Sequence, residues 1–258
     1  MAKWQLLGAC MAMALQLVAS KAVPGNLASF VNRIQAAGNC QNPISDSFFD
    51  KDSGGGRSGF VYCKDNANPG IVFIKGPGRD LADMDVDCDG ALGPGSDCNS
   101  GGDTQGQTSF KNIVSTYGIS DLDASLHSFV VFGNDNSGNL PGFGTFRPQD
   151  HGIEPLSIMA VVCNGKLLFG VWGDENGNDG QHSVIGEASL GLGRLCFGDG
   201  MSNESGHDEA DVMYIAFSGA DAVPGRDGAA WKARSRDEFQ NDPRFNALGD
   251  ALVQGIQG

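Results

Sequence analysis

The stretch LFGVWGDENGNDGQHSVIGEASL, residues 168–190, consists of two apolar segments on either side of a loop rich in glycine and asparagine. Short apolar segments bounded by such residues are typical of buried strands, and the polar loop predicts a turn between them. Asp174 and Glu187 lie at the two ends of this loop. The sequence therefore places two carboxylates on neighbouring rigid segments.

A pair of this kind suits general acid/base chemistry. Cleavage of a glycosidic bond needs one carboxylic acid that protonates the leaving oxygen and one carboxylate that activates water or attacks carbon. Two other interpretations compete, because Asp and Asn are common turn residues, and Asp174, Asn176 and Asn178 also open a calcium-loop pattern. The calcium template then fails, since Asp179 and Ile185 stand where it requires Gly and Glu.

Strand-like runs alternate with glycine-rich turns on both sides of this stretch, and they predict a compact β sandwich or barrel. Three segments have apolar residues at helical spacing instead, and the third is interrupted near Pro243. We therefore expect a mainly β fold with a few peripheral helices. The predicted strands cover residues 60–63, 71–74, 129–132, 158–163, 167–172 and 212–217, and the predicted helices 23–38, 109–117 and 236–256.

The first 22 residues have the features of a secretory signal peptide. Lys3 gives a positive start, residues 6–18 are apolar but too short to span a membrane, and residues 20–22 form a small-x-small cleavage site before Val23. We expect a secreted, extracellular protein in which residues 23–258 form a single domain.

The formal net charge of the whole chain is −14. Removal of the signal segment takes away Lys3 and Lys21 and leaves −16. This charge argues against nucleic acid and anionic membrane surfaces as partners and favours a cationic one. Nothing in the sequence indicates an oligomer, so we expect a monomer.

Six cysteines follow the signal segment, and an even number in an exported chain indicates three disulfides. A sequential scheme is the simplest of the 15 pairings that six cysteines allow. It joins Cys40 to Cys63, Cys88 to Cys98 and Cys163 to Cys196. No Cys or His spacing typical of zinc is present, and we expect neither a cofactor nor a metal.

A second acidic segment, Asp83-Met-Asp-Val-Asp-Cys-Asp89, alternates aspartates with apolar residues. A period of two places the aspartates on one face of an extended strand and the apolar side chains on the other. One interpretation is calcium binding, since Asp85, Asp87, Asp89 and Gly90 fill the first positions of a calcium loop; Ser96, however, replaces the bidentate Glu at position twelve. The alternatives are a cleft wall that faces a polycationic substrate and a plain solvated face.

Three further acidic or aromatic residues lie near these segments. Trp172 precedes Asp174 by two residues, so strand alternation predicts that both lie on one face and that Trp172 either packs in the core or stacks on a sugar ring. Asp121 and Asp123 are better explained by turn and capping roles than by a cleft. No Gly-x-Ser-x-Gly motif supports a serine nucleophile.

Seven sequence blocks together resemble the fungal chitosanases of glycoside hydrolase family 75, in the order of the family and over roughly residues 40–253. One such block alone would be unspecific, but seven in order are not. The blocks are MDVDCDG (84–90), GISDLDA (118–124), VVFGN (130–134), PLSIMAVVCNG (155–165), GVWGD (170–174), GEAS (186–189) and DAVPG (221–225).

This resemblance implies endo-hydrolysis of chitosan, the β-1,4 polymer of glucosamine, with inversion at the anomeric carbon. It places the two essential carboxylates on Asp174 and Glu187, with Glu187 as proton donor and Asp174 as the base that activates water. It also implies a small β-barrel core, for which the double-psi type is the candidate. An acidic cleft would attract the ammonium groups of chitosan, so the resemblance favours Asp85, Asp87 and Asp89, together with Trp172, as substrate-binding residues.

Overall fold

The computed structural model describes residues 21–51, 56–93, 96, 98, 104–178 and 180–258. Residues 1–20, on which most of the predicted signal peptide falls, lie outside these ranges. Lys21 and Ala22, its last two residues, form the short strand β1, which pairs antiparallel with β8.

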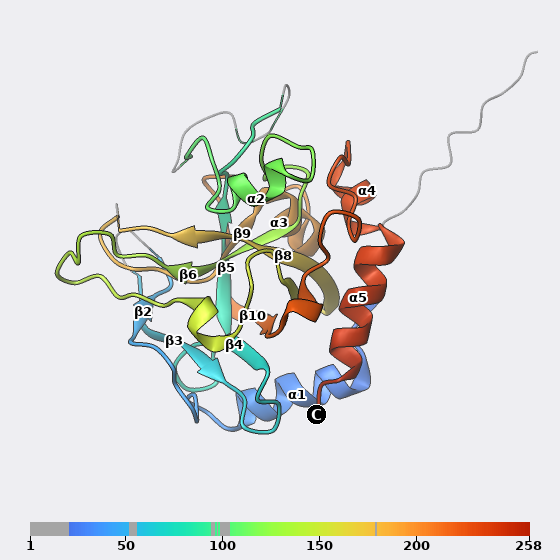
Figure 1. Cartoon of the computed structure of the whole chain (residues 1–258). Helices are drawn as coiled ribbons and strands as arrows, with labels where there is room; N and C mark the ends of the chain where they lie inside the picture. Colours follow the sequence, from blue (N-terminus) through green and yellow to red (C-terminus); the bar gives the residue numbers. More distant parts are fainter. Residues whose placement is uncertain (1–20, 52–55, 94–95, 97, 99–103, 179) are drawn as a thin grey trace, which may run out of the picture.

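The fold is mainly β, as predicted, with a few helices at the periphery (Figure 1). Each run of residues predicted as a strand lies within an observed strand. The strands after β1 are β2 (Phe48–Phe49), β3 (Ser58–Lys64), β4 (Ile71–Lys75), β5 (Ala82–Asp87), β6 (Phe129–Asn134), β7 (Ile158–Cys163), β8 (Lys166–Asn176), β9 (Glu187–Ser189) and β10 (His207–Phe217). The α-helices are α1 (Gly25–Ala36), α2 (Lys111–Ser115), α3 (Leu190–Phe197), α4 (Arg236–Gln240) and α5 (Pro243–Gln254).

The strand pairings close into a ring. Along the sheet the order runs β8, β6, β9, β5 and β10, and β7 then pairs with both β10 and β8. The ring contains two parallel pairs, β5 with β9 and β6 with β8, and the other pairs are antiparallel. This closure agrees with the predicted small barrel, while the double-psi label stays a prediction.

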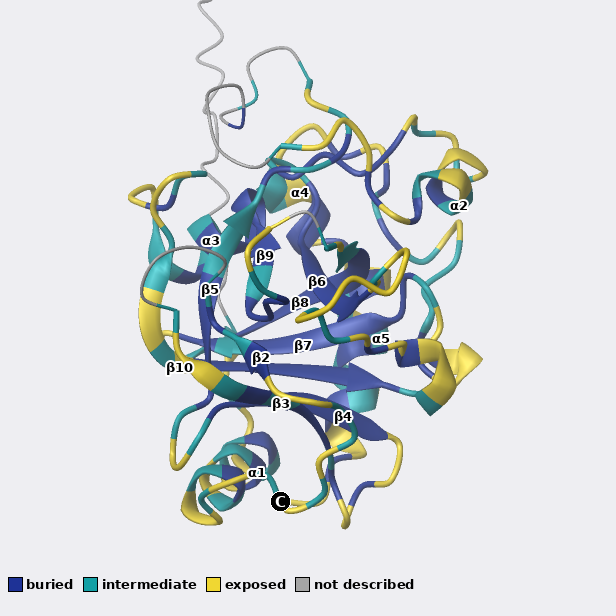
Figure 2. Cartoon of the chain, turned by 90° about the vertical axis from the view of Figure 1, so that its left-hand side faces the viewer, coloured by how far each residue is buried: buried dark blue, intermediate teal, exposed yellow. Residues whose placement is uncertain are grey.

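The ring is held by a densely buried core, and Figure 2 shows its strands largely in the dark blue of buried residues. β7 and β8 form a hairpin whose turn residues, Asn164 and Gly165, have φ angles of 47° and 69°. Such left-handed positions match the twist of a two-residue hairpin and favour Asn-Gly. The hairpin thus sets the register of the strand that carries Asp174.

The N-terminal and C-terminal helices pack close to one another, as Figure 1 shows for α1 and α5. Asn26 donates hydrogen bonds from its side chain to the carbonyl oxygens of Val253 and Ile256. Helix α1 buries Leu27, Phe30 and Ile34, the apolar residues that predicted it. The predicted break near Pro243 is also confirmed, because α4 ends at Gln240 and the Asp242 side chain caps the start of α5.

One helix was not predicted. Leu190–Phe197 forms α3 directly after β9, with the Ser189 hydroxyl accepting a hydrogen bond from the Leu192 amide as its N-cap. The segment is apolar on several sides and contains Gly191 and Gly193, so it lacks the one-sided pattern and the propensity that indicate a helix. The N-cap and the tight packing of α3 against the ring stabilise it instead.

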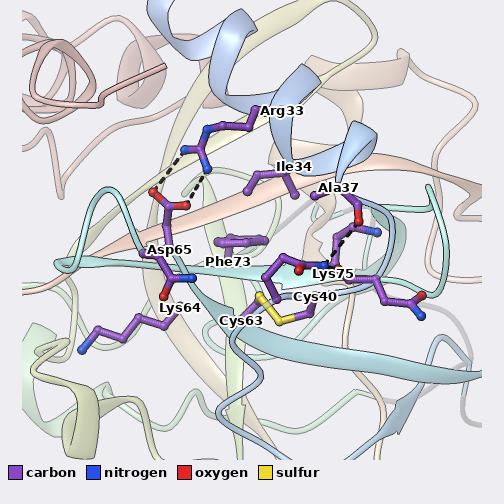
Figure 3. A pocket seen from close by; sticks show the side chains of 12 residues that line it. Arg33, Ile34, Ala37, Cys40, Cys63, Lys64, Asp65, Phe73 and Lys75 are labelled. Carbon is purple, nitrogen blue, oxygen red and sulfur yellow. Dashed lines mark hydrogen bonds and ion pairs between the residues drawn. A yellow bond between two sulfur atoms is a disulfide. The ribbon is translucent and has the colours of Figure 1, made fainter.

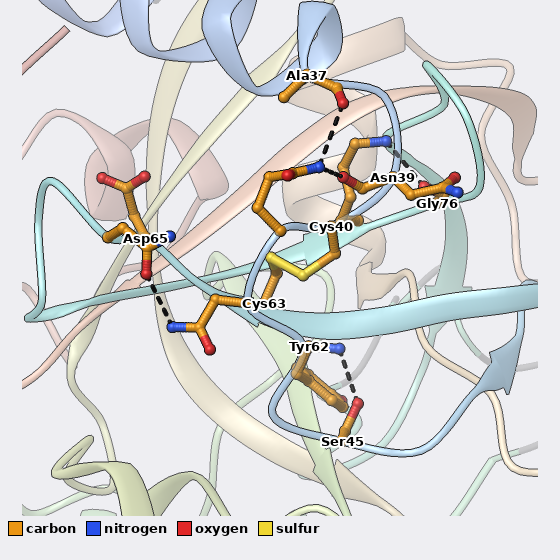
Figure 4. The surroundings of a disulfide bond; sticks show 12 residues. Ala37, Asn39, Cys40, Ser45, Tyr62, Cys63, Asp65 and Gly76 are labelled. Carbon is orange, nitrogen blue, oxygen red and sulfur yellow. Dashed lines mark hydrogen bonds between the residues drawn. A yellow bond between two sulfur atoms is a disulfide. The ribbon is translucent and has the colours of Figure 1, made fainter.

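All three disulfides follow the sequential scheme, which is thereby confirmed. Figure 4 shows the first of them, Cys40–Cys63, which joins the segment after α1 to β3. In the part of the chain that the structure describes, no helix is both long and apolar enough to cross a membrane.

Candidate active site

Asp174 and Glu187 lie on two strands that flank the same residue. Val131 on β6 is the register partner of Asp174 on β8 and also of Glu187 on β9. Residues in one such row point to the same side of a sheet. The two carboxylates predicted as a pair therefore face one another across a single intervening strand.

Both carboxylates open into a hollow of about 400 Å³. Besides Val86, Val131 and Gly177, its lining is polar: Asp87, Asp89, Gln105, Asp174, Glu175, Asn176 and Glu187. A second hollow of about 580 Å³ shares several of these residues and adds Gln107, Thr108, Ser109 and Asp135. The two hollows form one acidic cleft, which we call the catalytic cleft.

The Asp174 side chain is 4% exposed, and its two oxygens are held differently. Oδ1 accepts hydrogen bonds from the Ser109 amide (2.9 Å), the Ser109 hydroxyl (2.5 Å) and the Glu175 amide (2.8 Å). Oδ2 is buried and has no hydrogen-bond partner among the described residues. Burial raises the pKa of Asp174 to about 6, while the donors on Oδ1 favour its ionised form.

A chain of hydrogen bonds positions Ser109. The buried Asp121 carboxylate accepts from the amide (3.0 Å) and the hydroxyl (2.6 Å) of Thr108, the residue before Ser109. Asp123 accepts in the same way from the amides of Gly93 and Ser125. The structural role that the sequence favoured for both aspartates agrees with these contacts.

Trp172 lies on the opposite face from Asp174, contrary to the alternation expected from the sequence. Trp172 pairs with Val130 and Asp174 with Val131, so Gly173 is an extra residue, a β-bulge. A side chain at Gly173 would collide with Phe129, which explains glycine there. Trp172 is 0% exposed, so the predicted contact with a sugar is wrong; its Nε1 donates to the Asp174 carbonyl oxygen and helps to position that residue.

The four aspartates between residues 83 and 89 differ in their surroundings. Asp85 is the register partner of Glu187, and Asp87 and Asp89 line the catalytic cleft. Burial, together with the charges of Asp174, Asp89 and Glu187, raises the pKa of Asp87 well above its usual value. Burial also raises the pKa of Asp85 to about 6.

Asp83, in contrast, is 0% exposed, and neither of its carboxylate oxygens has a hydrogen-bond partner among the residues described. Burial raises its pKa to about 9, so it is neutral at ordinary pH. The expectation that all four aspartates share a solvated or substrate-facing surface is therefore wrong for Asp83.

Sequence reasoning missed Glu175, Asp135 and Ser109. Glu175 follows Asp174 directly, and simple alternation would direct it away from the cleft, yet it lines both hollows. Burial and the nearby charges of Asp135 and Asp174 raise the pKa of Glu175 to about 7. Ser109 lies 65 residues from Asp174, and no local signal links the two.

Asp87, Asp89 and Asp174 are the described residues best arranged to surround a cation, because one oxygen from each lies within 4.8 Å of the others. Clustered carboxylates serve a cationic organic group equally well, so this arrangement alone assigns no metal.

The comparisons with known proteins agree with this site. Residues 84–255 match the family described as fungal chitosanase of glycosyl hydrolase group 75. The chain is 43% identical to an endo-chitosanase of Aspergillus oryzae over 237 residues, which cover 91% of this chain and 92% of that protein. It is 41% identical to an endo-chitosanase of Aspergillus fumigatus over the same shares of both chains.

These matches cover the strands that carry Asp174 and Glu187, and they include proteins of nearly the same length as this one. The identity is well above the level at which family membership is in doubt. The chain belongs to the glycosyl hydrolase group 75 family of fungal chitosanases and is a glycoside hydrolase.

Proposed function

We propose that the protein is a secreted endo-chitosanase that hydrolyses the β-1,4 linkages of chitosan with inversion at the anomeric carbon. The observation that carries this proposal is the shared register of Asp174 and Glu187 on Val131. The endo-chitosanases to which the chain is similar support the substrate.

The shared register of Asp174 and Glu187 indicates the stereochemical outcome of the reaction. Strands lie about 4.8 Å apart, so two residues on either side of one strand have backbones roughly 9 to 10 Å apart. Inverting glycosidases separate their carboxyl groups by about 6.5 to 9.5 Å, which leaves room for a water molecule, whereas retaining enzymes need about 5 to 5.5 Å. The intervening strand favours the larger separation.

The surroundings divide the roles between the two carboxylates. Asp174 has three donors on Oδ1, which stabilise its negative charge, as a base requires. Glu187 faces Asp85 across the strand pair and interacts with Asp87, and like charges favour a proton on one member of such a group. We assign Glu187 as the proton donor and Asp174 as the base that takes a proton from water.

The acidic cleft explains a preference for chitosan over neutral polymers. Protonated glucosamine carries an ammonium group, and Asp89 and Glu175 offer carboxylates along the cleft. Asp85 adds a further acidic group beside Glu187. An acidic cleft concentrates such a polymer and selects it over its N-acetylated form. The three disulfides suit an extracellular protein. We further propose that residues 23–258 act as one monomeric domain that binds neither nucleic acid nor membranes.

A reducing-end and viscosity assay tests this function on chitosan, chitin and carboxymethyl cellulose, with Asp174→Asn and Glu187→Gln as matched variants. We expect activity on chitosan alone, a rapid fall in viscosity, and a loss of at least about 10³-fold in either variant. NMR of the first product, taken before mutarotation, should show the α-anomer. Binding without cleavage by the wild-type protein would contradict the proposal.

A further inference from the structure

The unequal surroundings of the two Asp174 oxygens indicate which of them meets water. Oδ1 already accepts three hydrogen bonds, and an oxygen so occupied is a poor proton acceptor. Oδ2 is buried, carries no hydrogen bond from any described residue, and belongs to a side chain that lines the catalytic cleft. Of the two oxygens, Oδ2 is therefore the one with capacity left to accept a proton from a water molecule.

Asp87 lies close to the Asp174 carboxylate. It lines the same hollow, and one of its carboxyl oxygens lies within 4.8 Å of a carboxylate oxygen of Asp174. Two acceptors that share one water molecule are separated by about 4.5 Å, given hydrogen bonds of about 2.8 Å and a near-tetrahedral angle. The gap between Asp87 and Asp174 is thus short enough for one water molecule to bridge.

We propose that Asp87 is a third catalytic carboxyl group, which holds the attacking water jointly with Asp174. One hydrogen of the water points to Asp174 Oδ2 and the other to a carboxyl oxygen of Asp87. The lone pair then points away from both, toward the anomeric carbon. This inference rests on the proposed hydrolysis and adds a residue to it.

The proton balance assigns Asp87 the role of acceptor only. The water oxygen bonds to the anomeric carbon while the bond from that carbon to the glycosidic oxygen breaks. Glu187 gives its proton to the leaving oxygen, and Asp174 receives one proton from the water. The second hydrogen of the water remains on the new hydroxyl group, so Asp87 never removes it.

Neighbouring aspartates are placed differently. Asp89 accepts a hydrogen bond of 2.5 Å from the Gln105 amide, and Asp85 lies beside Glu187 and interacts with Lys51. Asp87 itself is fixed by the Asp89 amide, which donates to its Oδ1 over 2.6 Å. Asp89 also comes within 4.8 Å of Asp174. Asp87 is the one that lies in β5 beside the strand of Glu187, and the charge of Asp174 acts on it more strongly than that of any other residue.

The test compares Asp87→Asn with Asp87→Leu. These side chains have nearly the same shape, but only Asn keeps a carbonyl acceptor. We expect Asp87→Asn to keep at least about a tenth of the wild-type kcat, and Asp87→Leu to lose about 100-fold or more with a similar KM, as for a misplaced nucleophile. Asp46→Asn changes an exposed aspartate outside the catalytic cleft and is the control; it should leave both kcat and KM unchanged. Asp87→Ala replaces the Leu variant if that one does not fold.

Two results would overturn the proposal. If Asp87→Asn is as inactive as Asp174→Asn, Asp87 is itself a base. If the Asn and Leu variants both change KM alone, Asp87 binds substrate and does not hold the water. Wild-type protein that leaves chitosan intact would instead contradict the proposed function, so the two failures are distinguishable.

Discussion

Buried carboxylates in two hollows of the molecule have opposite surroundings and opposite pKa shifts. Beneath α1, the hollow in Figure 3 contains Asp65, whose carboxylate accepts two hydrogen bonds from the Arg33 guanidinium and two from Asn68. Burial alone would raise the pKa of Asp65, but these donors lower it below its usual value. In the catalytic cleft, burial raises the pKa values of Asp87, Asp174 and Glu175, and no described residue supplies a comparable cation bonded to Asp87 or Asp174.

The difference separates stability from function. A buried carboxylate that is fully paired contributes to folding and has little capacity left for a ligand. A buried carboxylate without a cation is costly, and that cost is lowered when a proton or a cationic group arrives. The carboxylates without a cation thus cluster where a polycation would bind, whereas the paired carboxylate stabilises the fold.

The largest effect should come from Asp83, a buried carboxyl group whose oxygens have no hydrogen-bond partner among the described residues. Its pKa is about 9 in the folded protein and near 3.8 in the unfolded chain, so unfolding releases a proton between these values and stability falls as pH rises. The penalty grows by up to about 1.4 kcal/mol per pH unit. We expect Asp83→Asn to be more stable than the wild type by about 2–3 kcal/mol near pH 6.

Thermal and urea unfolding at about pH 3.5 and pH 6 measure this difference. The variant and the wild type should agree at the lower pH, where both chains carry a neutral group. Asp46→Asn removes an exposed aspartate and serves as the control. A gap of equal size at both pH values would mean that the substitution changes packing and not charge.

The next effect concerns the hollow beneath α1, which we call the paired hollow because Arg33 pairs there with Asp65. Arg33→Met leaves Asp65 buried without its cation, and we expect a loss of about 2 kcal/mol in the free energy of unfolding, less than for a fully buried pair because Arg33 is 37% exposed. The contribution of the pair is present above the ordinary pKa of aspartate and is lost as pH falls through the lowered pKa of Asp65.

Urea unfolding at neutral and acidic pH measures this loss of stability, and kcat on chitosan is measured for the same variant. The stability deficit should shrink in acid, and kcat should not change. The double variant Arg33→Met with Asp65→Asn should recover part of the loss. A fall in kcat would show that the two hollows are coupled.

A smaller effect is expected from Ser109→Ala, which makes the catalytic cleft less like the paired hollow. The change removes the hydroxyl donor on Asp174 Oδ1 and keeps the two backbone donors. We expect kcat to fall about tenfold, the value of one hydrogen bond to a charged group. The pKa of Asp174 should rise, so the acidic limb of the kcat/KM profile should move to higher pH.

Kinetics over a range of pH measure both quantities. Ser115→Ala is the control, since its hydroxyl donates to the Asn112 carbonyl oxygen on the surface. An unshifted acidic limb in Ser109→Ala would mean that Asp174 does not set it.

The smallest effect should be that of Asp85→Asn on substrate binding. Asp85 is partly buried and lies near the charge of Lys51, so its carboxylate contributes modestly, and we expect KM for chitosan to rise about threefold to tenfold at low salt. The difference from the wild type should shrink in about 0.5 M salt, because screening weakens exposed charge pairs. A loss of thermal stability that calcium restores would indicate a metal at the aspartates of residues 83–89 instead.

Much of the fold follows from local patterns. The alternation of apolar runs and turns predicted β3, β4, β6, β7, β8 and the second half of β10, but not β1 or β2. Helical spacing predicted α1, α2, α4 and α5. The disulfides join cysteines that are neighbours in order along the chain, so the simplest pairing was correct. The acid/base pair was proposed from the two segments around the loop, and the resemblance then implied the same two residues. Its arrangement around Val131 depends on a ring of strands that no local pattern reveals.

The errors have local causes as well. The bulge at Gly173 inverted the face of Trp172, because one extra residue changes the parity of the strand. Asp83 and Asp87 share a strand face by sequence, yet neighbouring elements cover only the former completely. Ser109 reaches Asp174 through the fold alone.

The strand between the two carboxylates has a consequence for how such an enzyme diversifies. The loop that joins Asp174 to Glu187 does not set the gap between them, since both are fixed to β6. Residues can therefore be inserted into or removed from that loop during evolution, and such changes would alter the number of sugar units bound and the length of the fragments released. The anomeric configuration of the product would stay the same.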